Sequence, residues 1–209
     1  MMGEQDQFAS QYDVSRETIE RLCIYEDLLK KWTTRINLIA RSTISQIWSR
    51  HFADSAQIFN EIPVNSEKLS DFGSGGGFPG LVIAALGLEK MPELHVSLVE
   101  SDVRKASFLV TAAREMGLRV DVHADRVESL QPQAADVVTA RALAPLGDLL
   151  SLAEMHLKNH GTAMFLKGER HQEELDIAST MWDFKVNKQK STTNDASALL
   201  IITNLRRAA

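Results

Sequence analysis

The sequence contains a single cysteine, Cys23, and no long run of apolar residues. One cysteine excludes an internal disulfide and any zinc site built from several cysteines, and we assign no metal ligands. No apolar stretch approaches the roughly 20 residues that a membrane-spanning helix needs, so we expect no membrane contact. The first ten residues, MMGEQDQFAS, lack the apolar core of a secretory signal peptide. Since reduced thiols are normal inside cells, we expect a cytoplasmic protein.

Positive charge is also in short supply, because 23 Lys and Arg residues face 28 Asp and Glu residues, a net charge of −5. The chain as a whole is therefore not a polyanion binder by bulk charge. One stretch departs from this average, since residues 28–53 hold no acid but contain Lys30, Lys31, Arg35, Arg41, Arg50 and His51. Such a stretch forms either a solvated helix face or a local patch that docks phosphates.

The N-terminal third of the chain has helical periodicity. Apolar residues recur at steps of three, four and seven over residues 14–39, with Ser15 as the expected N-cap, and again over residues 43–62. Trp32 and Trp48 lie on the apolar faces of these two helices, where core packing is favoured over stacking on a base. We therefore expect an N-terminal helical extension over residues 1–63.

Residues 64–209 alternate between strand and helix patterns and form the second expected unit. Strands are predicted at 69–72, 95–100, 118–124, 135–141, 161–168, 182–190 and 198–204, and helices at 79–88, 101–117 and 145–157. Val103 is expected on the inward face of the second of these helices. This alternation predicts an α/β fold with a mostly parallel sheet covered by helices on both faces. Ligands of such sheets bind beyond the C-terminal ends of the strands.

A glycine-rich loop follows the first predicted strand and reads DFGSGGGFPG, with Gly73, Gly75 and Gly77 inside it. Glycines let the backbone approach a ligand closely and adopt positive φ. The Gly-Lys-Ser of a nucleoside triphosphatase is absent. The helix that follows is short, whereas a dinucleotide site places its pyrophosphate at the start of a long one. The loop therefore favours a cofactor without a pyrophosphate.

Three further strand ends carry candidate binding residues. Glu100 ends the second strand, where an acid accepts hydrogen bonds from the ribose hydroxyls of NAD or of S-adenosylmethionine. Val127 and Glu128 follow the third strand, either as an adenine contact or as an ordinary loop. Arg141 ends the fourth strand and should meet an acid, a carboxylate ligand or a phosphate, because an unpaired buried arginine is costly. The simpler alternative for Arg141 is a structural salt bridge. The simpler alternative for Glu100 is a strand end that faces solvent.

Taken in order, these motifs resemble the bacterial 16S ribosomal RNA methyltransferase G family (RsmG, also called GidB). The likeness runs from about Leu28 to Lys167 and rests on Trp32…Asn37-Leu38, Arg50-His51-Phe-Ala-Asp54-Ser55, DFGSGGGFPG, Val99-Glu100-Ser101…Lys105…Phe108-Leu109, Arg126-Val127-Glu128, Ala140-Arg141-Ala142 and Leu166-Lys167-Gly168. The sequence departs from the family pattern at Trp32-Thr33 and Asn37-Leu38-Ile39, and the segment after Gly168 matches least.

The resemblance implies a Rossmann-like class I methyltransferase fold with an N-terminal helical extension. It also implies S-adenosyl-L-methionine as cofactor, with contacts at Gly73, Phe78, Val127, Glu128 and Arg141. The implied reaction is methylation of N7 of a guanine in 16S ribosomal RNA, so that the partner is this RNA or the small ribosomal subunit. Nothing in the sequence suggests an oligomer, and we expect a monomer.

The residues at the predicted crevice agree with an acceptor that needs positioning only. Guanine N7 carries a lone pair and no proton, so in-line methyl transfer requires no general base. The Asn-Pro-Pro-Tyr or Asp-Pro-Pro-Tyr expected of an exocyclic-amine methyltransferase is absent after the fourth strand, and no cysteine lies near. We assign no catalytic residue and expect Arg141 and Lys167 to contact the acceptor, while the basic stretch of residues 28–53 grips RNA.

Three other functions compete with this interpretation. A methyltransferase for a small molecule or a protein would have the same cofactor loop, and the acid-free basic stretch argues mildly against it. A nicotinamide-dependent oxidoreductase lacks support, because no Tyr-x-x-x-Lys or comparable group of residues is present. A non-catalytic RNA-binding module would not need an intact glycine loop followed by Glu100.

Overall fold

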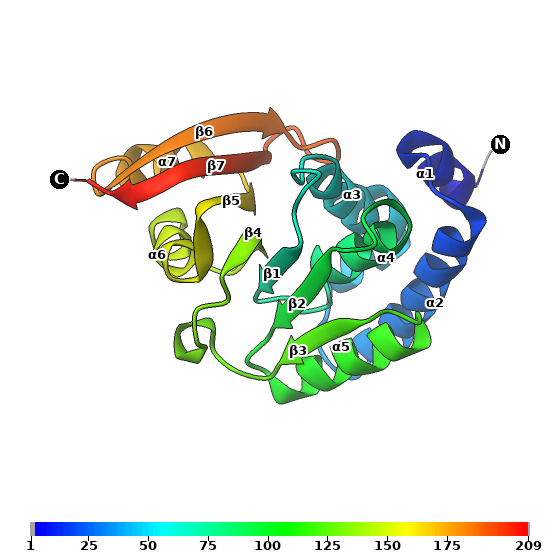
Figure 1. The fold of residues 1–209 in the computed structure, drawn as a ribbon. Helices are drawn as coiled ribbons and strands as arrows, with labels where there is room; N and C mark the ends of the chain where they lie inside the picture. The colour runs from blue at the N-terminus through cyan, green and yellow to red at the C-terminus, as the bar shows by residue number, and fades with distance from the viewer. Residues whose placement is uncertain (1–2, 209) are drawn as a thin grey trace.

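The computed structural model describes residues 3–208, while Met1, Met2 and Ala209 lie outside it. One sheet of seven strands crosses the molecule in the order β3-β2-β1-β4-β5-β7-β6 (Figure 1). The strands are β1 (Lys68–Phe72), β2 (His95–Val99), β3 (Val120–His123), β4 (Ala135–Arg141), β5 (Leu157–Lys167), β6 (Trp182–Lys190) and β7 (Ala198–Arg207). The first five run parallel, and β7 is antiparallel to both β5 and β6. The predicted α/β fold with a mostly parallel sheet is confirmed.

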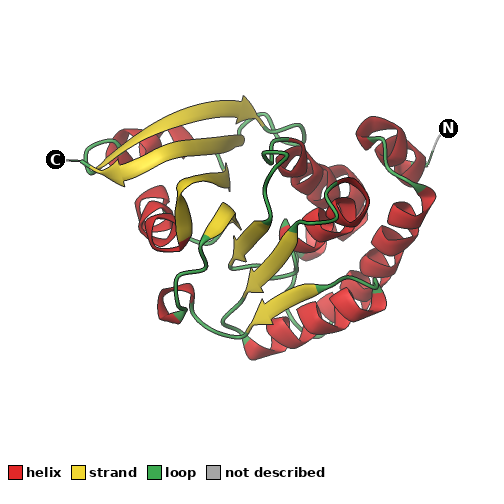
Figure 2. Cartoon of the chain, in the orientation of Figure 1, coloured by secondary structure: helices red, strands yellow, loops and turns green. Residues whose placement is uncertain are grey.

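Helices cover both faces of this sheet (Figure 2). They are α1 (Glu4–Tyr12), α2 (Arg16–Thr33), α3 (Ala53–Asn60), α4 (Gly80–Lys90), α5 (Val103–Glu115), α6 (Leu146–His156) and α7 (His171–Ala178), with short turns η1 (Arg41–Gln46), η2 (Ile47–Phe52) and η3 (Val127–Ser129). Alternating side chains of β5 pack into two separate apolar clusters, with Met164 and Leu166 on one face and Phe165 on the other. The sheet is therefore buried on both sides, as parallel sheets generally are.

The N-terminal helices differ from their predicted lengths. Ser15 caps α2 by accepting a hydrogen bond from the Thr18 amide, as expected, but the helix ends at Thr33 and not near residue 39. The single helix predicted for residues 43–62 is wound in three ways, as a 3₁₀ turn (η1), a π turn (η2) and an α-helix (α3). Apolar periodicity predicts a buried helical face and does not distinguish these windings.

Other elements were predicted less accurately. Val103, expected inside, opens α5 with 67% of its surface exposed. Leu157, expected on α6, instead begins β5, which starts four residues before the predicted Gly161. The short helices α1 and α7 were not predicted at all. Asp102 is the N-cap of α5, since its side chain accepts from the amides of Arg104 and Lys105.

The N-terminal helices share an apolar core with the helices that cover the sheet. Leu22, Tyr25 and Leu29 of α2 are fully buried in the same cluster as Leu81 of α4 and Leu98 of β2. The unit boundary expected at residue 63 stays a prediction. Among residues 3–208, no helix combines the length and the apolar character that crossing a membrane requires.

Candidate functional site

The glycine loop joins β1 to α4 at the C-terminal edge of the sheet. Gly73, Gly75 and Gly77 all have positive φ, at 63°, 55° and 94°. A Cβ on Gly73 would lie 2.6 Å from the Leu143 side chain, and one on Gly77 would lie 2.5 Å from Leu81 and Tyr25. At Gly75 the nearest atom to such a Cβ is the Gly73 carbonyl oxygen at 3.7 Å. Gly77 therefore serves packing, whereas Gly75 leaves room for a ligand.

Glu100 follows β2 and holds this loop in place. Its Oε2 accepts a hydrogen bond from the Gly75 amide and its Oε1 accepts one from the Asp102 amide, both at 2.8 Å. The side chain is buried, so the alternative of a solvent-facing strand end is wrong. A carboxylate offers about four lone-pair sites, so two remain for further donors such as ribose hydroxyls.

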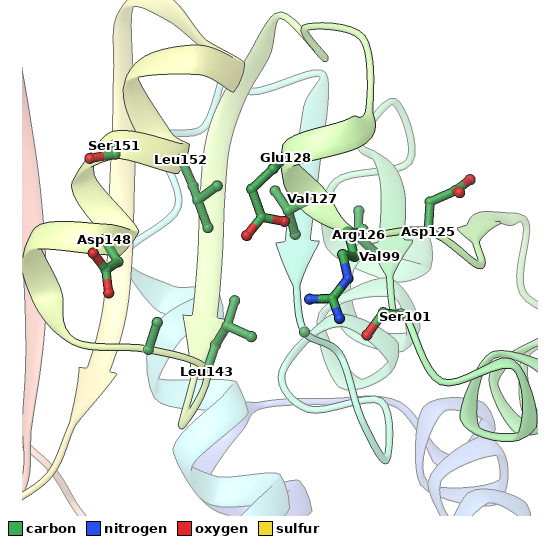
Figure 3. A pocket seen from close by; sticks show the side chains of 12 residues that line it. Val99, Ser101, Asp125, Arg126, Val127, Glu128, Leu143, Asp148, Ser151 and Leu152 are labelled. Atoms are coloured by element: carbon green, nitrogen blue, oxygen red, sulfur yellow. The ribbon is translucent and has the colours of Figure 1, made fainter.

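A first cavity of about 440 Å³ opens beside this loop. Its lining residues are Gly73, Val99, Ser101, Asp125, Arg126, Val127, Glu128, Leu143, Ala144, Asp148, Ser151 and Leu152 (Figure 3). Three predicted cofactor residues, Gly73, Val127 and Glu128, are thus brought together. Val127 and Glu128 begin η3, and the first amides of a helical turn have no carbonyl partner within it. The volume and the mixture of apolar and polar lining residues suit a nucleoside-sized ligand.

A second cavity of about 460 Å³ lies on the other side of the segment after β4. Ala142 lines the second cavity, whereas the next two residues, Leu143 and Ala144, line the first. Ala142 has a φ of 53°, a left-handed conformation that costs a residue with a Cβ roughly 1–2 kcal/mol. The second cavity also contains Arg50, His51, Asp54, Arg141, Lys167 and Glu174. A methyl donor bound in one cavity and a methyl acceptor bound in the other would therefore be neighbours.

Arg141 projects from the end of β4 into a polar cluster at the second cavity. Its Nη1 donates to His51 Nδ1 at 3.0 Å and lies 3.9 Å from Asp54 Oδ2. Its guanidinium carbon lies 4.8 Å above the Phe78 ring, in cation–π contact. The acid that the sequence requires for Arg141 is therefore Asp54, and the structural salt bridge is present.

His51 is held in one tautomer by this cluster. Because Nδ1 accepts from Arg141, the proton lies on Nε2, which is 2.9 Å from Thr43 Oγ1. Burial, and then the charges of Arg141 and Arg50, lower the pKa of His51 to about 3. The imidazole is therefore neutral at physiological pH.

Asp71 lies beneath the loop and out of reach of both cavities. Its Oδ1 accepts from the Thr139 hydroxyl at 2.8 Å and its Oδ2 accepts from the Gly80 amide at 3.3 Å. Burial raises the pKa of Asp71 to about 6, although hydrogen bonds from Ser74 and Thr139 oppose the shift. Its position indicates a structural role that ties β1 to β4 and α4.

Several predicted site residues are placed differently from the expectation. Gly75, Gly77 and Glu100 line neither cavity, and Arg141 lines the second cavity and not the first. Phe78 is buried and lines neither cavity, since its ring packs against Tyr25, His51 and Phe52. Lys167 does line the second cavity, but its Nζ donates to the Ala144 carbonyl at 2.8 Å and pairs with Glu174 at 2.7 Å. Both side chains support the walls of the site in this conformation.

Five of the six basic residues of the stretch are exposed, and His51 is buried. Lys30, Lys31, Arg35, Arg41 and Arg50 are exposed, as a phosphate-docking role requires, although Lys30 pairs with Glu26 at 2.8 Å. His51 is buried and bonded to Arg141 and Thr43, which argues against the phosphate contact expected of it. Trp48 is buried as well, against Phe8 and Phe52, so core packing is its role.

Sequence reasoning missed the partnership of His51 and Asp54 with Arg141. A signal was available, because His51 and Asp54 are three residues apart and such residues share a helix face. Arg141, however, is separated from His51 by 90 residues. Only the packing of η2 and α3 against the end of β4 brings them together.

A family model described as rRNA small subunit methyltransferase G matches residues 18–200. A protein named ribosomal RNA small subunit methyltransferase G from Ruegeria sp. TM1040 is 46% identical over 93% of this chain and 95% of its own length. The same name belongs to a Rhodospirillum centenum protein that is 48% identical over 95% of this chain and 89% of its own length.

Solved structures with the same fold are more distant in sequence. Pyrococcus horikoshii TYW2 in complex with MeSAdo has a TM-score of 0.57 at 15% identity, over 83% of this chain and 65% of that one. A SAM-dependent O-methyltransferase from Thermotoga maritima has a TM-score of 0.59 at 14% identity, over 88% and 73%. This chain is an S-adenosylmethionine-dependent methyltransferase and belongs to the rRNA small subunit methyltransferase G family.

Proposed function

We propose that this chain transfers a methyl group from S-adenosyl-L-methionine to N7 of a guanine in 16S ribosomal RNA. The observation that carries the proposal is the pair of adjacent cavities on either side of residues 142–144. One has the features of a nucleoside site, and the other is lined by cations whose acidic neighbours are paired with them. The family to which the chain belongs supports RNA as the acceptor.

The first cavity is the proposed cofactor site. The bound cofactor supplies an electrophilic methyl group on a sulfonium. Glu100 would accept from the ribose hydroxyls, and Val127 and Glu128 would hold the adenine edge. Gly73 and Gly75 let the backbone approach, and Arg141 lies at the boundary with the second cavity, where the methyl group must point.

The second cavity is the proposed acceptor site, and its acids and histidine have hydrogen-bond partners. Asp54 accepts hydrogen bonds from Ser191 and Thr193, and Glu174 accepts from the Leu146 amide and pairs with Lys167. Both nitrogens of His51 have partners, and its low pKa keeps it neutral. Both acids of this cavity are therefore hydrogen-bonded and lie close to a cation, and His51 is neutral with its proton on Nε2. An acceptor that carries a lone pair and no proton, such as guanine N7, fits this arrangement.

The exposed cations of the N-terminal third are the proposed docking residues for the RNA backbone. Arg50 lines the acceptor cavity itself, and Lys30, Lys31, Arg35 and Arg41 extend the positive charge along the neighbouring surface. Phosphate contacts position RNA without reading its sequence. The partner is then 16S RNA or the small subunit in the cytoplasm, approached by a monomer.

Calorimetric titration with S-adenosylhomocysteine and separately with NADH tests the cofactor site. We expect micromolar binding of the first and none of the second. Incubation of the protein with S-adenosylmethionine and unmodified 16S RNA, free or in small subunits, then tests the acceptor. N7-methylguanine in either substrate supports the proposal, whereas binding of NADH alone, or methyl transfer to another atom, contradicts it.

A further inference from the structure

A groove of about 410 Å³ lies outside both cavities, between the C-terminal end of α2 and the first turns of α5. Its lining residues are Lys31, Trp32, Arg35, Ile36, Arg104 and Ser107. The two helices pack against each other and lie side by side in Figure 1. Lys31 and Arg35 are among the proposed docking residues, while Trp32 and Arg104 have no role in the proposed function.

Positive charge surrounds the groove on two sides. Lys31 and Arg35 are exposed, and neither forms an ion pair within residues 3–208. Arg104 faces them from α5 and contacts Asp102 at 3.4 Å, in a pair that is largely exposed. Exposed pairs contribute little to stability, so Arg104 is available to an incoming anion. Three cations and no acid among the lining residues indicate an anionic ligand.

Trp32 adds an aromatic surface to this charge. Its ring meets Phe108 edge to face, with centroids 5.5 Å apart, while the side chain remains partly exposed and lines the groove. Grooves that bind single-stranded nucleic acid combine cations along the backbone with an aromatic ring on which a base stacks. An acidic peptide would use the cations, but it would gain little from the indole.

The chain connects this groove to both cavities. Ile36 is two residues before Leu38, which lines the acceptor cavity, and Arg104 is three residues after Ser101, which lines the cofactor cavity. The groove therefore lies toward the same edge of the sheet as the site of transfer. An RNA with one base in the acceptor cavity has flanking nucleotides near this edge.

We propose that the groove binds an unpaired nucleotide of the RNA substrate away from the methylated base. The base stacks on Trp32, and the adjoining phosphates contact Lys31, Arg35 and Arg104. This inference rests on the proposed function, which makes RNA the substrate. The groove would then contribute to substrate binding and take no part in the methyl transfer.

Tryptophan fluorescence gives a direct readout of this contact. Trp48 and Trp182 are each only 2% exposed, so Trp32 is the tryptophan that a ligand reaches. Titration of the full chain with a hexauridylate oligonucleotide should quench its emission. Trp32→Phe keeps an aromatic ring against Phe108 and should lose most of this quenching while unfolding cooperatively like the parent.

Neutral substitution of the two arginines tests the phosphate contacts. For the double variant Arg35→Gln/Arg104→Gln, the slope of log affinity against log salt should fall by roughly 1.4, since each contact with a single strand adds about 0.7. Arg114→Gln is the matched control, because Arg114 is also on α5, is exposed and lies outside the groove. For Arg114→Gln, the slope of log affinity against log salt should equal the parent's.

Several results would overturn the inference. Absence of quenching by the oligonucleotide, or equal slopes for the double variant and Arg114→Gln, would contradict it. Equal quenching by poly-glutamate would instead make the groove a docking surface for an acidic protein. If 16S RNA is methylated but the double variant and Arg114→Gln have equal salt slopes, the nucleotide site in the groove is overturned and the proposed function is not. Quenching by the oligonucleotide without methylation of any RNA overturns the proposed function and leaves the groove as a nucleotide site.

Discussion

At the scale of single residues, the site depends on backbone positions where a side chain would fill the space of a ligand. Gly75 is such a position, since its amide is bonded to Glu100 and its surroundings are open. Glu100 in turn is held by two amides of different elements, the loop and the start of α5. The carboxylate is therefore oriented before any ligand arrives, which lowers the entropic cost of binding.

Gly75→Asp should abolish binding of S-adenosylhomocysteine while the chain still folds. The new carboxylate would lie beside Glu100, and Asp tolerates positive φ better than most residues. Calorimetric titration measures the loss, and a thermal melt checks folding. Gly117→Asp is the control, because Gly117 has a φ of 67°, no atom within 4 Å of an added Cβ, and a place at the far end of α5. Tight binding by Gly75→Asp would contradict the assigned cavity.

His51 predicts a pH dependence of stability. Its pKa is about 3 in the folded chain and near 6.5 when unfolded, so between these values the unfolded state binds more protons. Its contribution is therefore complete above pH 6.5 and is lost as the pH falls toward 3. Between pH 7 and pH 4.5 the loss should be roughly 2–3 kcal/mol.

The comparison with His51→Gln isolates this effect. Glutamine can accept from Arg141 and donate to Thr43, but it does not titrate in this range. The opposite contribution of Asp71, whose raised pKa of about 6 favours folding as the pH falls, is common to both proteins and cancels. Urea unfolding at pH 7 and pH 4.5 should show the larger loss in the parent. Equal losses would mean that His51 is not the neutral, buried group described.

At the scale of elements, the ends of three helices determine where the site residues lie. η2 and α3 carry His51 and Asp54 against the end of β4, and Ser191 and Thr193, between β6 and β7, hydrogen-bond to Asp54. On the other face, α6 is linked to η3. His156, the last residue of α6, is buried and lies 3.1 Å from the Val127 carbonyl oxygen through Nε2.

Loss of the hydrogen bond between His156 and the Val127 carbonyl should weaken cofactor binding specifically. His156→Phe removes the donor to Val127, a loss of about 1 kcal/mol, so we expect a roughly fivefold higher KM for S-adenosylmethionine. kcat and the KM for RNA should stay near the parent's values. His156→Gln restores a donor and should recover much of the affinity. An equal fall in kcat and in thermal stability, without recovery in His156→Gln, would indicate a role in general packing.

At the scale of the whole molecule, the N-terminal helices and the sheet form one packed body. α2 buries Leu22, Tyr25 and Leu29 against the helices of the sheet, and the Tyr25 hydroxyl donates to the Gly76 carbonyl of the glycine loop. The extension therefore supports the cofactor loop from behind. The change from helical to alternating strand–helix pattern falls at residue 63, whereas one apolar core contains residues from both sides of that position.

Unfolding should accordingly be a single cooperative transition. Trp32 and Trp48 report on the N-terminal helices and Trp182 on the start of β6, so Trp182→Phe and the double variant Trp32→Phe/Trp48→Phe separate the two signals. In urea, the fluorescence midpoint of each variant should coincide with its own midpoint by far-UV circular dichroism. Separate midpoints would show that residues 1–63 unfold as an independent unit.

The elements that the sequence predicted well are those whose pattern is local. β4 spans the predicted 135–141, and the glycine loop, Glu100 and Arg141 lie at strand ends as expected, because strand–helix alternation places them at one edge. Val103 and Leu157 were misplaced, since apolar character alone does not decide which side of a helix is covered or where a strand begins.

By itself, the sequence determined the α/β class and the positions of the glycine loop and Glu100 at strand ends, because strand–helix alternation and glycine placement are local patterns. Only the tertiary structure decided that Asp54 and His51 neutralise and orient Arg141, that Phe78 lies beneath it, and that Trp32 meets Arg104 across a groove. These contacts join segments tens of residues apart. Their geometry depends on how helices pack on a sheet, which no local pattern contains.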